Sequence, residues 1–511
     1  MANRGSSKEF QSRKKALEPD RESVKIQHDK GKLTAMERIS LLVDKDSFTE
    51  LDAFAEAQNM DMQHKKKARD GVIIGHAAIA SRPVYIYAQD FTFMGGSMGE
   101  IHNRKIAKAM KEALKSGCPV IGLLDSGGAR IQEGISALDS GGEIFKANTY
   151  ASGVIPQISA ILGPCAGIAV YSPALTDFIL MAKKTSYMFI TGPEVIKTVT
   201  GEEIGFEELG GSKAHSEQSG VAHFTADNEK QCLQMIKLLL SYLPQNNLDN
   251  PPYIDMNDSP DRATTKLNDI VPEDAKKSYD MREVISEVLD KRSFFEIQEN
   301  YAQNAVIGLG RLNNNVVGIV ATQPSVLAGC LDIKSSGKIA RFVRFCDSFN
   351  IPLVNFVDVT GYLPGTEQEH SGIIRHGAKI LFAFSEATVP KISLVLRKAY
   401  GGAYIALVSK QMGFDRVLAW PNAEIAVMGA EQAVNIISRR DLQGKDADKI
   451  RKEKVKEYSE KFLNPYAAAS EGRIDMIIEP KETRKMLVKS LEMVSSKREK
   501  LPAKKHGIIP L

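Results

Sequence analysis

The sequence is poor in cysteine, with five among 511 residues, and its charges are almost balanced. The five cysteines form neither an even disulfide framework nor a Cys-x-x-Cys metal pair, so we expect buried, unpaired thiols in a reducing compartment. A net charge of +4 gives no electrostatic reason to expect nucleic acid as a partner. The charged N-terminus carries no apolar run typical of a secretory signal. We therefore expect a cytoplasmic protein.

Long apolar runs are also scarce. The stretch without charged residues, 147–176, contains three prolines and three glycines. A helix in lipid would lose backbone hydrogen bonds at each of these breaks. We therefore predict buried strands joined by tight turns, and no insertion into a membrane.

Several familiar catalytic patterns are missing as well. The sequence has no Walker-type Gly-Lys-Ser/Thr loop and no His-x-x-x-His or His-x-x-Glu-His spacing. These absences argue against a nucleotide-triphosphate enzyme and against a zinc enzyme, and we expect no metal ion. Residues 95–99 are rich in glycine but lack the spacing of a dinucleotide-binding loop.

An internal repeat is the strongest positive feature. Residues 44–51 read DKDSFTEL, and residues 290–297 read DKRSFFEI. Further matches follow in the same order, among them Asp125 with Asp358, at an offset of 233 that drifts to 234 and then 235. An ordered series of matches indicates a duplicated domain.

The repeat divides the chain into four parts. We expect a basic N-terminal arm at 1–34, one domain at 35–250, a linker at 251–279 and a second domain at 280–511. The linker is rich in Asn, Asp and Pro, as linkers commonly are. Short apolar runs alternate with helix-period segments, which predicts an α/β fold. Strands are expected at 84–88, 120–124 and 158–162, and helices at 104–115, 339–349 and, opened by a Thr34 capping box, 35–43.

Glycines follow buried strands at corresponding places in both copies, in residues 125–130, 163–168, 358–361 and 400–403. A turn that opens a helix presents backbone N–H groups without partners. Two such groups can form an oxyanion hole, in which each donor supplies ~3–4 kcal/mol to the transition state. The alternative is that these glycines only permit tight turns.

Long segments of the chain carry a resemblance. They include GVIIGHAAIASRPVYIYAQDFTFMGGSMGE, DSGGARIQEG, ASGVIPQISAILGPCAGIAVYSPALTDF, HSGIIRHGAKILFAFSEATVPKISLV and RKAYGGAY. From about residue 32 to residue 511 the sequence resembles the carboxyltransferase (beta) subunit of biotin-dependent acyl-CoA carboxylases, such as propionyl-CoA carboxylase. It is equally similar to the large transcarboxylase subunit and to the alpha subunit of methylmalonyl-CoA decarboxylase.

The resemblance implies a fold of two tandem crotonase-like (ClpP-like) ββα-spiral domains and a homo-hexamer built as a dimer of trimers. It implies transfer of a carboxyl group between carboxybiotin, on a separate carrier protein, and the α-carbon of a short acyl-CoA through a thioester enolate. Propionyl-, acetyl- and butyryl-CoA are the expected substrates. Biotin carboxylase and the biotin carboxyl carrier would be the partners. The alternative is the reverse half-reaction, in a methylmalonyl-CoA decarboxylase or a transcarboxylase.

The resemblance also assigns residues. The N–H groups of Gly167 and Ile168 would hold the enolate, and those of Gly402 and Ala403 the ureido oxygen of biotin. Ile405 would influence the choice of acyl group. The remaining assignments are Gly127, Gly128, Ala129, Arg130, Cys165 and Ala166 for acyl-CoA, and Gly361, Tyr400, Gly401 and Tyr404 for biotin.

Three positions depart from the family pattern. Ile168 stands where a second glycine is usual, Thr360 replaces a proline, and Ile405 replaces an aspartate of propionyl-preferring enzymes. An apolar residue at 405 predicts tolerance of several short acyl-CoAs, because one methylene is worth only ~1–3 kcal/mol. For the CoA phosphates, Arg130 and the basic residues before position 34 are candidates. The alternatives are an ion pair of Arg130 with Asp125 or Glu133, and a solvated N-terminal helix.

Two other classes of function stay open. A crotonase-like hydratase or hydrolase would need a carboxylate pair or a Ser–His pair, for which Glu194 and Asp177 are candidates. A binding scaffold for the carrier protein would need no chemistry at all. The first class leaves the second copy and its glycine turn unexplained, and the second predicts no decarboxylation of a malonyl-CoA-type substrate by the purified chain with biotin.

Overall fold

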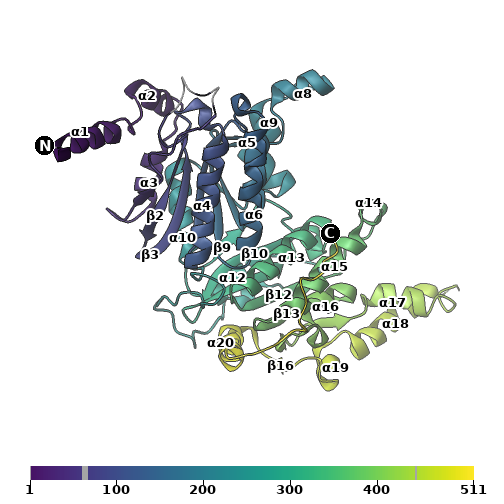
Figure 1. The fold of residues 1–511 in the computed structure, drawn as a ribbon. Helices are drawn as coiled ribbons and strands as arrows, with labels where there is room; N and C mark the ends of the chain where they lie inside the picture. Colours follow the sequence, from purple (N-terminus) through teal and green to yellow (C-terminus); the bar gives the residue numbers. More distant parts are fainter. Residues whose placement is uncertain (1, 60–61, 63–66, 444–445) are drawn as a thin grey trace. The chain divides into compact units, whose positions relative to one another are not determined.

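The computed structural model describes residues 2–59, 62, 67–443 and 446–511. The chain forms two compact units, residues 1–249 and 250–511 (Figure 1). The segment expected to be a linker packs with the second unit. There Arg311 donates to the Pro252 carbonyl at 2.8 Å, and Arg484 donates to the Ser259 carbonyl at 2.9 Å.

The first unit contains an eight-stranded sheet with the order β1-β2-β3-β4-β5-β6-β8, and β7 pairs with β5. The first two strand pairs are antiparallel and the others are parallel. The strands are β1 Thr49–Leu51, β2 Val72–Ile79, β3 Arg82–Gln89, β4 Val120–Ser126, β5 Gln157–Ala166, β6 Phe178–Ala182, β7 Tyr187–Phe189 and β8 Phe224–Ala226.

Helices cover this sheet. All seven residues of β4 are buried, as expected for a strand with helices on both faces. Helices α4 and α6 pack against each other, α3 and α4 both pack on β2 and β3, and α10 contacts β5, β6 and β8 (Figure 1). The helices of this unit are α1 Ala2–Lys15, α2 Arg21–Asp29, α3 Ala35–Leu42, α4 Glu100–Ser116, α5 Ile135–Asp139, α6 Gly141–Ala151, α7 Tyr171–Ala174, α8 Pro193–Thr200, α9 Phe206–Gly210 and α10 Glu229–Leu240, with short turns η2 Met94–Gly96, η3 Ile131–Glu133, η4 Gly167–Val170 and the π-helix η5 Ala214–Ser219.

The second unit repeats this plan strand for strand. Its sheet has the order β16-β14-β13-β12-β11-β10-β9, and β15 pairs with β13. The strands are β9 Phe295–Ile297, β10 Ala305–Leu312, β11 Asn315–Thr322, β12 Leu353–Val359, β13 Lys391–Tyr400, β14 Arg416–Ala419, β15 Glu424–Ala426 and β16 Met476–Ile477. The helices are α11 Leu267–Ile270, α12 Met281–Val288, α13 Ile333–Ser348, α14 Thr366–His370, α15 Ile373–Glu386, α16 Gly401–Val408, α17 Ala430–Ile437, α18 Ala447–Phe462, α19 Pro465–Ser470 and α20 Thr483–Val494, with turns η6 Leu327–Gly329, η7 Lys410–Met412 and η8 Pro480–Glu482.

The local predictions agree with these elements. The three predicted strands lie within β3, β4 and β5, and the two predicted long helices match α4 and α13. The capping box at the start of α3 is confirmed: the Glu37 N–H donates to Thr34 Oγ1 at 3.3 Å, and the Thr34 N–H donates to Glu37 Oε2 at 2.8 Å.

The cysteines are all unpaired. Four of them are buried, but the prediction of burial is wrong for Cys330, which is only half-buried. This residue lies at the end of a short turn, where its Sγ lies 3.0 Å from Thr360 Oγ1. Among the described residues, no helix is both long and apolar enough to cross a bilayer.

Candidate active site

The first predicted pair of N–H groups lies where β5 ends and η4 begins. Ala166 is extended, with φ −125° and ψ 152°, and Gly167 follows with φ +58°. No side chain caps this turn. The N–H groups of Gly167 and Ile168, which we call the first amide pair, have no acceptor within the turn that they open, because a helical turn leaves its first donors unpaired. The pair can therefore donate to an external oxygen.

The second unit forms the same turn where β13 ends and α16 begins. Tyr400 is extended, with φ −114° and ψ 145°, and Gly401 follows with φ +57°. No side chain caps this helix either. The N–H groups of Gly402 and Ala403, the second amide pair, lie in its first turn and lack intrahelical acceptors.

The backbone angles correct the alignment of the two copies at this point. The left-handed glycine is Gly167 in one unit and Gly401 in the other, an offset of 234. The sheet registers agree, because Cys165 pairs with Ser126 and Ala399 pairs with Val359. The offset between the two copies therefore stays at 234 here, and the predicted drift to 235 is wrong. As a result, the second amide pair begins one residue further into its turn than the first.

A glycine loop lies against the first amide pair. Gly128 has φ +101°, and a Cβ on it would lie 2.8 Å from the Ala166 carbonyl oxygen. Its N–H donates to Ser126 Oγ at 3.1 Å, and the Gly127 N–H donates to the Gly95 carbonyl at 2.9 Å. Ala129 bridges to the strand-like residue Met98. The structure thus brings the predicted residues 127–129 and 165–168 together.

Arg130 does not have a free guanidinium. The side chain is fully buried and pairs with Asp70 at 2.6 Å and Glu133 at 2.7 Å. A third contact joins it to the Ser97 carbonyl at 2.8 Å. The expected ion pair with Glu133 is present, whereas the partner expected at Asp125 is replaced by Asp70. With both carboxylates bound to it, the guanidinium is held in the protein interior and does not face a CoA phosphate.

Residues 95–99 also have the Gly-x-Ser-x-Gly spacing of many hydrolases, with Ser97 in the centre. Its Oγ accepts a hydrogen bond from Arg130 Nε at 3.3 Å, not from a histidine. The carboxylates considered for a hydratase are also unsuited to the task. Asp177 is buried and accepts from the Gln157 N–H at 2.8 Å, whereas Glu194 is exposed on α8.

The sequence did not reveal a buried ion cluster beneath the first amide pair. Asp125 pairs with Lys32 at 2.7 Å and with Arg38 at 3.0 Å, and Arg38 also pairs with Glu229 at 2.7 Å. A Cβ on Gly163 of β5 would lie 1.9 Å from Asp125 Oδ1, so the carboxylate packs directly on this strand. Burial lowers the pKa of Lys32, and the Asp125 charge opposes that shift. Lys32 is therefore part of the interior and not of a solvated arm.

The corresponding carboxylate in the second unit is Asp358. It accepts from Arg397 Nε at 2.8 Å and from the Tyr279 hydroxyl at 3.1 Å. Burial raises the pKa of Tyr279 well above its usual value, which keeps the hydroxyl protonated. Arg397 also donates to the Lys277 carbonyl at 2.8 Å. The internal repeat identified Asp125 and Asp358 as equivalent residues but did not reveal the side chains that bind them.

Other predicted residues differ in accessibility. The Cys165 thiol is buried, lies 3.3 Å from the Ala169 carbonyl and has its pKa raised by burial, so it is a packing residue and not a nucleophile. Ile405 lies on α16 and is 47% exposed. Gly361 has φ +139° and open space around it. Ile168 is half-buried, and its Cδ1 lies 2.3 Å from where a Cβ on Gly141 would be.

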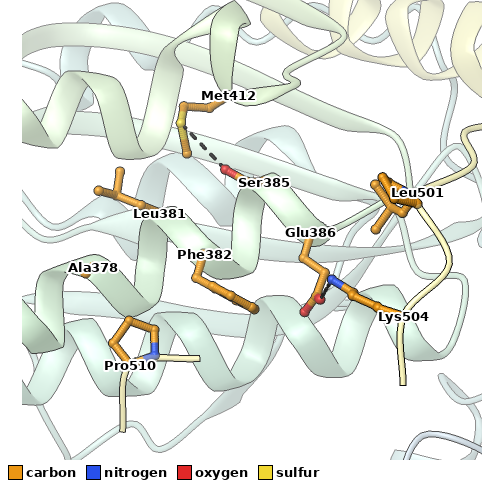
Figure 2. Close-up of a pocket in the computed structure, with 10 residues that line it drawn as sticks. Ala378, Leu381, Phe382, Ser385, Glu386, Met412, Leu501, Lys504 and Pro510 are labelled. Carbon is orange, nitrogen blue, oxygen red and sulfur yellow. Dashed lines mark hydrogen bonds and ion pairs between the residues drawn. The ribbon is translucent and has the colours of Figure 1, made fainter. Parts of the chain in front are cut away.

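A cavity of about 490 Å³ lies elsewhere in the second unit, between α15, η7 and the C-terminal tail (Figure 2). Glu386 at its rim pairs with both Arg344 and Lys504. The cavity is lined by none of the predicted site residues. Its lining consists of Ala378, Leu381, Phe382, Ser385, Glu386, Met412, Leu501, Pro502, Lys504 and Pro510. No group of three or more His, Cys, Asp or Glu able to hold a metal occurs in the described part of the chain.

Comparison with known proteins decides the family. The carboxyl transferase domain family matches residues 26–509. The chain belongs to this family. The propionyl-CoA carboxylase carboxyltransferase subunit of Haloferax mediterranei is 56% identical, over 96% of this chain and 95% of the relative. The methylmalonyl-CoA decarboxylase subunit alpha of Veillonella parvula is 54% identical, over the same shares of the two chains.

Similarity to solved structures confirms the predicted fold. The transcarboxylase 12S hexamer, solved with methylmalonyl-coenzyme A and methylmalonic acid bound, matches with a TM-score of 0.96 and 50% identity. The match covers 99% of this chain and 98% of that one. A single-chain, multi-domain long-chain acyl-CoA carboxylase has the same fold, with a TM-score of 0.82 at 23% identity. The two tandem crotonase-like domains of this carboxyl transferase thus agree with the sequence analysis.

Proposed function

We propose that this carboxyl transferase moves a carboxyl group between carboxybiotin, carried on a separate protein, and the α-carbon of a short acyl-CoA. The observation that carries the proposal is the presence of one uncapped amide pair in each unit, at matching strand-to-helix turns. The reaction develops negative charge on two oxygens, those of the thioester and of the ureido ring. Two pairs of donors meet that need without an ionisable side chain.

The first amide pair would hold the thioester oxygen. As the α-proton passes to the ureido nitrogen from which the carboxyl group has left, that oxygen would become an enolate oxygen, and the N–H groups of Gly167 and Ile168 would stabilise its charge. The α-carbon of the enolate would then take up the released carboxyl group. Fixed backbone donors need no reorganisation at that moment, and the loss of one donor typically costs about 10²–10³ in kcat. Residues 127–129 would border the acyl-CoA, since they lie against the same strand end.

The second amide pair fits the ureido group of biotin. Biotin, when delivered by its carrier, supplies the carboxyl group that is transferred. The N–H groups of Gly402 and Ala403 would donate to its carbonyl oxygen, with Gly361, Tyr400, Gly401 and Tyr404 around it. The two pairs serve two substrates, so each unit contributes one half of the reaction.

A backbone variant tests this assignment. Gly401→Val forces a branched side chain onto a residue with φ +57°, which disrupts the turn. We expect methylmalonyl-CoA decarboxylation with free biotin to fall by about 10²-fold or more. The matched control is Gly337→Val, the same exchange at a glycine of α13 that lies outside the left-handed region and has open space around it. Equal activity of the Gly401→Val variant and the wild type would contradict the proposal.

The acyl preference follows from Ile405. An apolar and 47% exposed side chain gives no charge or hydrogen bond with which to select one acyl group. We therefore propose that acetyl-, propionyl- and butyryl-CoA all react. A comparison of kcat/KM for the three thioesters measures this, and a preference above about a hundredfold for one of them would overturn it.

The direction of the reaction depends on the partners. A biotin carboxylase with a biotin carboxyl carrier would make the chain part of an acyl-CoA carboxylase, whereas relatives of similar identity are decarboxylase subunits. Purification of the tagged chain with its native partners and mass identification of the biotinylated protein separates the two. The transcarboxylase 12S structure is a hexamer, and we propose the same dimer of trimers here. The unpaired cysteines favour a reducing compartment such as the cytoplasm.

A further inference from the structure

The two amide pairs have different neighbours. At the positions before and beside the first pair lie Ala166 and Ala129, two of the smallest side chains. The corresponding positions in the second unit, at offsets of 234 and 233, are Tyr400 and Tyr362. The two copies therefore share the backbone turn but differ in the side chains that border it.

Tyr362 lies beside the second amide pair. Its ring atoms would be 3.5 and 3.6 Å from a Cβ on Gly402, and 2.9 Å from one on Gly377 of α15. The hydroxyl lies 3.4 Å from the Gly377 carbonyl, and burial raises the pKa of Tyr362 to about 12. The backbone is fixed too, since Tyr362 bridges to Leu331 and the next N–H donates to the Leu331 carbonyl at 2.8 Å. The ring is thus held between two helices but stays half-exposed.

Tyr400 is fixed from the other side. It is 8% exposed, and its hydroxyl donates to Glu424 of β15. Strand β15 pairs with the end of β13, with Tyr400 opposite Ala426. Burial and then the Glu424 carboxylate raise the pKa of Tyr400, so the hydroxyl keeps its proton and remains the donor. Since Tyr400 immediately precedes Gly401, this bond fixes the residue from which the turn begins.

We propose that Tyr362 is a flat wall that makes the second amide pair selective for a planar ring, and that Glu424 is a positioning residue that acts through Tyr400. The inference rests on the proposed function, because the planar ring is the ureido ring of biotin. A rigid aromatic face beside two converging donors contacts a flat ring over its whole area, whereas a flexible chain would lose its conformational freedom there. The first pair, bordered by alanines, leaves room for the thioester and its acyl group.

The assay is decarboxylation of methylmalonyl-CoA by the whole assembly with free biotin as the second substrate. We expect Tyr362→Ala to raise the KM for biotin by about tenfold and to leave the KM for the thioester within twofold. Tyr362→Phe keeps the ring and loses only a 3.4 Å contact, so it should behave as the wild type. Equal increases in both KM values, or no change in either, would overturn the role of Tyr362.

Glu424 requires a double-variant test, because a positioning role predicts non-additivity. Tyr400→Phe and Glu424→Ala each remove the same hydrogen bond, so each should raise the KM for biotin by a similar factor, and the double variant should be no worse than either. Additive effects, or a loss confined to the melting temperature, would overturn the role of Glu424. If the wild type shows no decarboxylation that depends on biotin, it is the proposed function that fails and not the reading of these tyrosines.

Discussion

Arg38 connects the N-terminal segment to the sheet below the first amide pair, and its replacement by methionine is the sharpest test of how this unit is held together. The side chain is 1% exposed. Its guanidinium donates to Glu229 at 2.8 and 2.7 Å, to Asp125 at 3.0 Å and to the Leu162 carbonyl at 3.0 Å. Methionine has a similar length and would fill much of the space, so the variant removes the charge more than the packing.

The size of the stability loss depends on which interactions Asp125 and Glu229 retain in the variant. Asp125 keeps Lys32 at 2.7 Å, and Glu229 keeps a hydrogen bond from the Leu33 N–H at 3.2 Å but loses its bidentate pair with Arg38. A buried carboxylate without its cation is costly, and removal of one partner of a buried pair typically destabilises by ~3–5 kcal/mol. Hydrogen bonds to charged groups at ~1.5–3 kcal/mol each would sum to more, but bonds of one network are not additive. We expect a loss of ~3–5 kcal/mol in the free energy of unfolding, a large part of a total near 5–15 kcal/mol.

The assay is urea unfolding followed by far-UV circular dichroism, with hydrogen exchange measured in α3 and β5. Since Arg38 bonds to Leu162 of β5, exchange should rise in that strand as well as in α3. Arg104→Met is the matched control, because Arg104 pairs with Glu100 at 2.8 Å but is 57% exposed. An exposed pair contributes ~0–1 kcal/mol, so this control should unfold almost as the wild type does.

A second variant separates charge from packing. In the double variant Arg38→Met, Glu229→Leu, the carboxylate that has lost its cation is removed as well. We expect part of the stability to return, since an apolar pair is often as stable as the buried ion pair that it replaces. A loss in the single variant below about 1 kcal/mol, or a double variant less stable than the single one, would refute the argument that unpaired buried charge dominates.

Three further predictions concern separate features. Gly128 has φ +101°, and a Cβ on it would lie 2.8 Å from a carbonyl oxygen of β5, so Gly128→Ala should lower the free energy of unfolding by ~1–3 kcal/mol and also lower kcat. Gly142→Ala, at a position with open space, is the control and should change neither. Thermal unfolding and the decarboxylation assay measure the two effects. Burial, and then a neighbouring arginine, lower the pKa of His102 to about 3. As pH falls from 6.5 toward 3, the unfolded chain therefore binds a proton that the folded chain does not, and the wild type loses stability. Between pH 7 and pH 5 the free energy of unfolding of His102→Asn should fall by ~2 kcal/mol less than that of the wild type. Glu386→Gln removes the shared carboxylate of two exposed cations and should speed tryptic cleavage of residues 496–511; an unchanged rate would show that the tail is held by its apolar contacts.

Much of the fold was predictable because its signals are local or repeated. The strands 84–88 and 120–124 are short apolar runs, and the capping box at Thr34 needs only four consecutive residues. The glycine turns were found because each copy supports the interpretation of the other. A left-handed residue can be anticipated wherever glycine follows a buried strand.

The partners of the buried charges were not predictable in the same way. Arg38 and Glu229 are separated by 191 residues, and Arg130 and Asp70 by 60. Charged residues carry no periodicity that announces burial, and the one correct pairing, Arg130 with Glu133, joins residues three apart. Glu424 likewise reaches Tyr400 only because β15 pairs with β13. Such contacts arise from topology.

The one-residue correction explains why isoleucine is tolerated at position 168. With Gly167 equivalent to Gly401, the counterpart of Ile168 is Gly402, not Ala403. In the first unit the isoleucine side chain fills the space left by Gly141, where a Cβ would lie 2.3 Å from it. In the second unit the ring of Tyr362 lies 3.5 Å from the Cβ position of Gly402, which admits a methyl group but not a branched side chain. Isoleucine and glycine are therefore not interchangeable between the two copies. Glycine would be accommodated in the first unit, whereas isoleucine in the second would displace the wall that we assign to biotin.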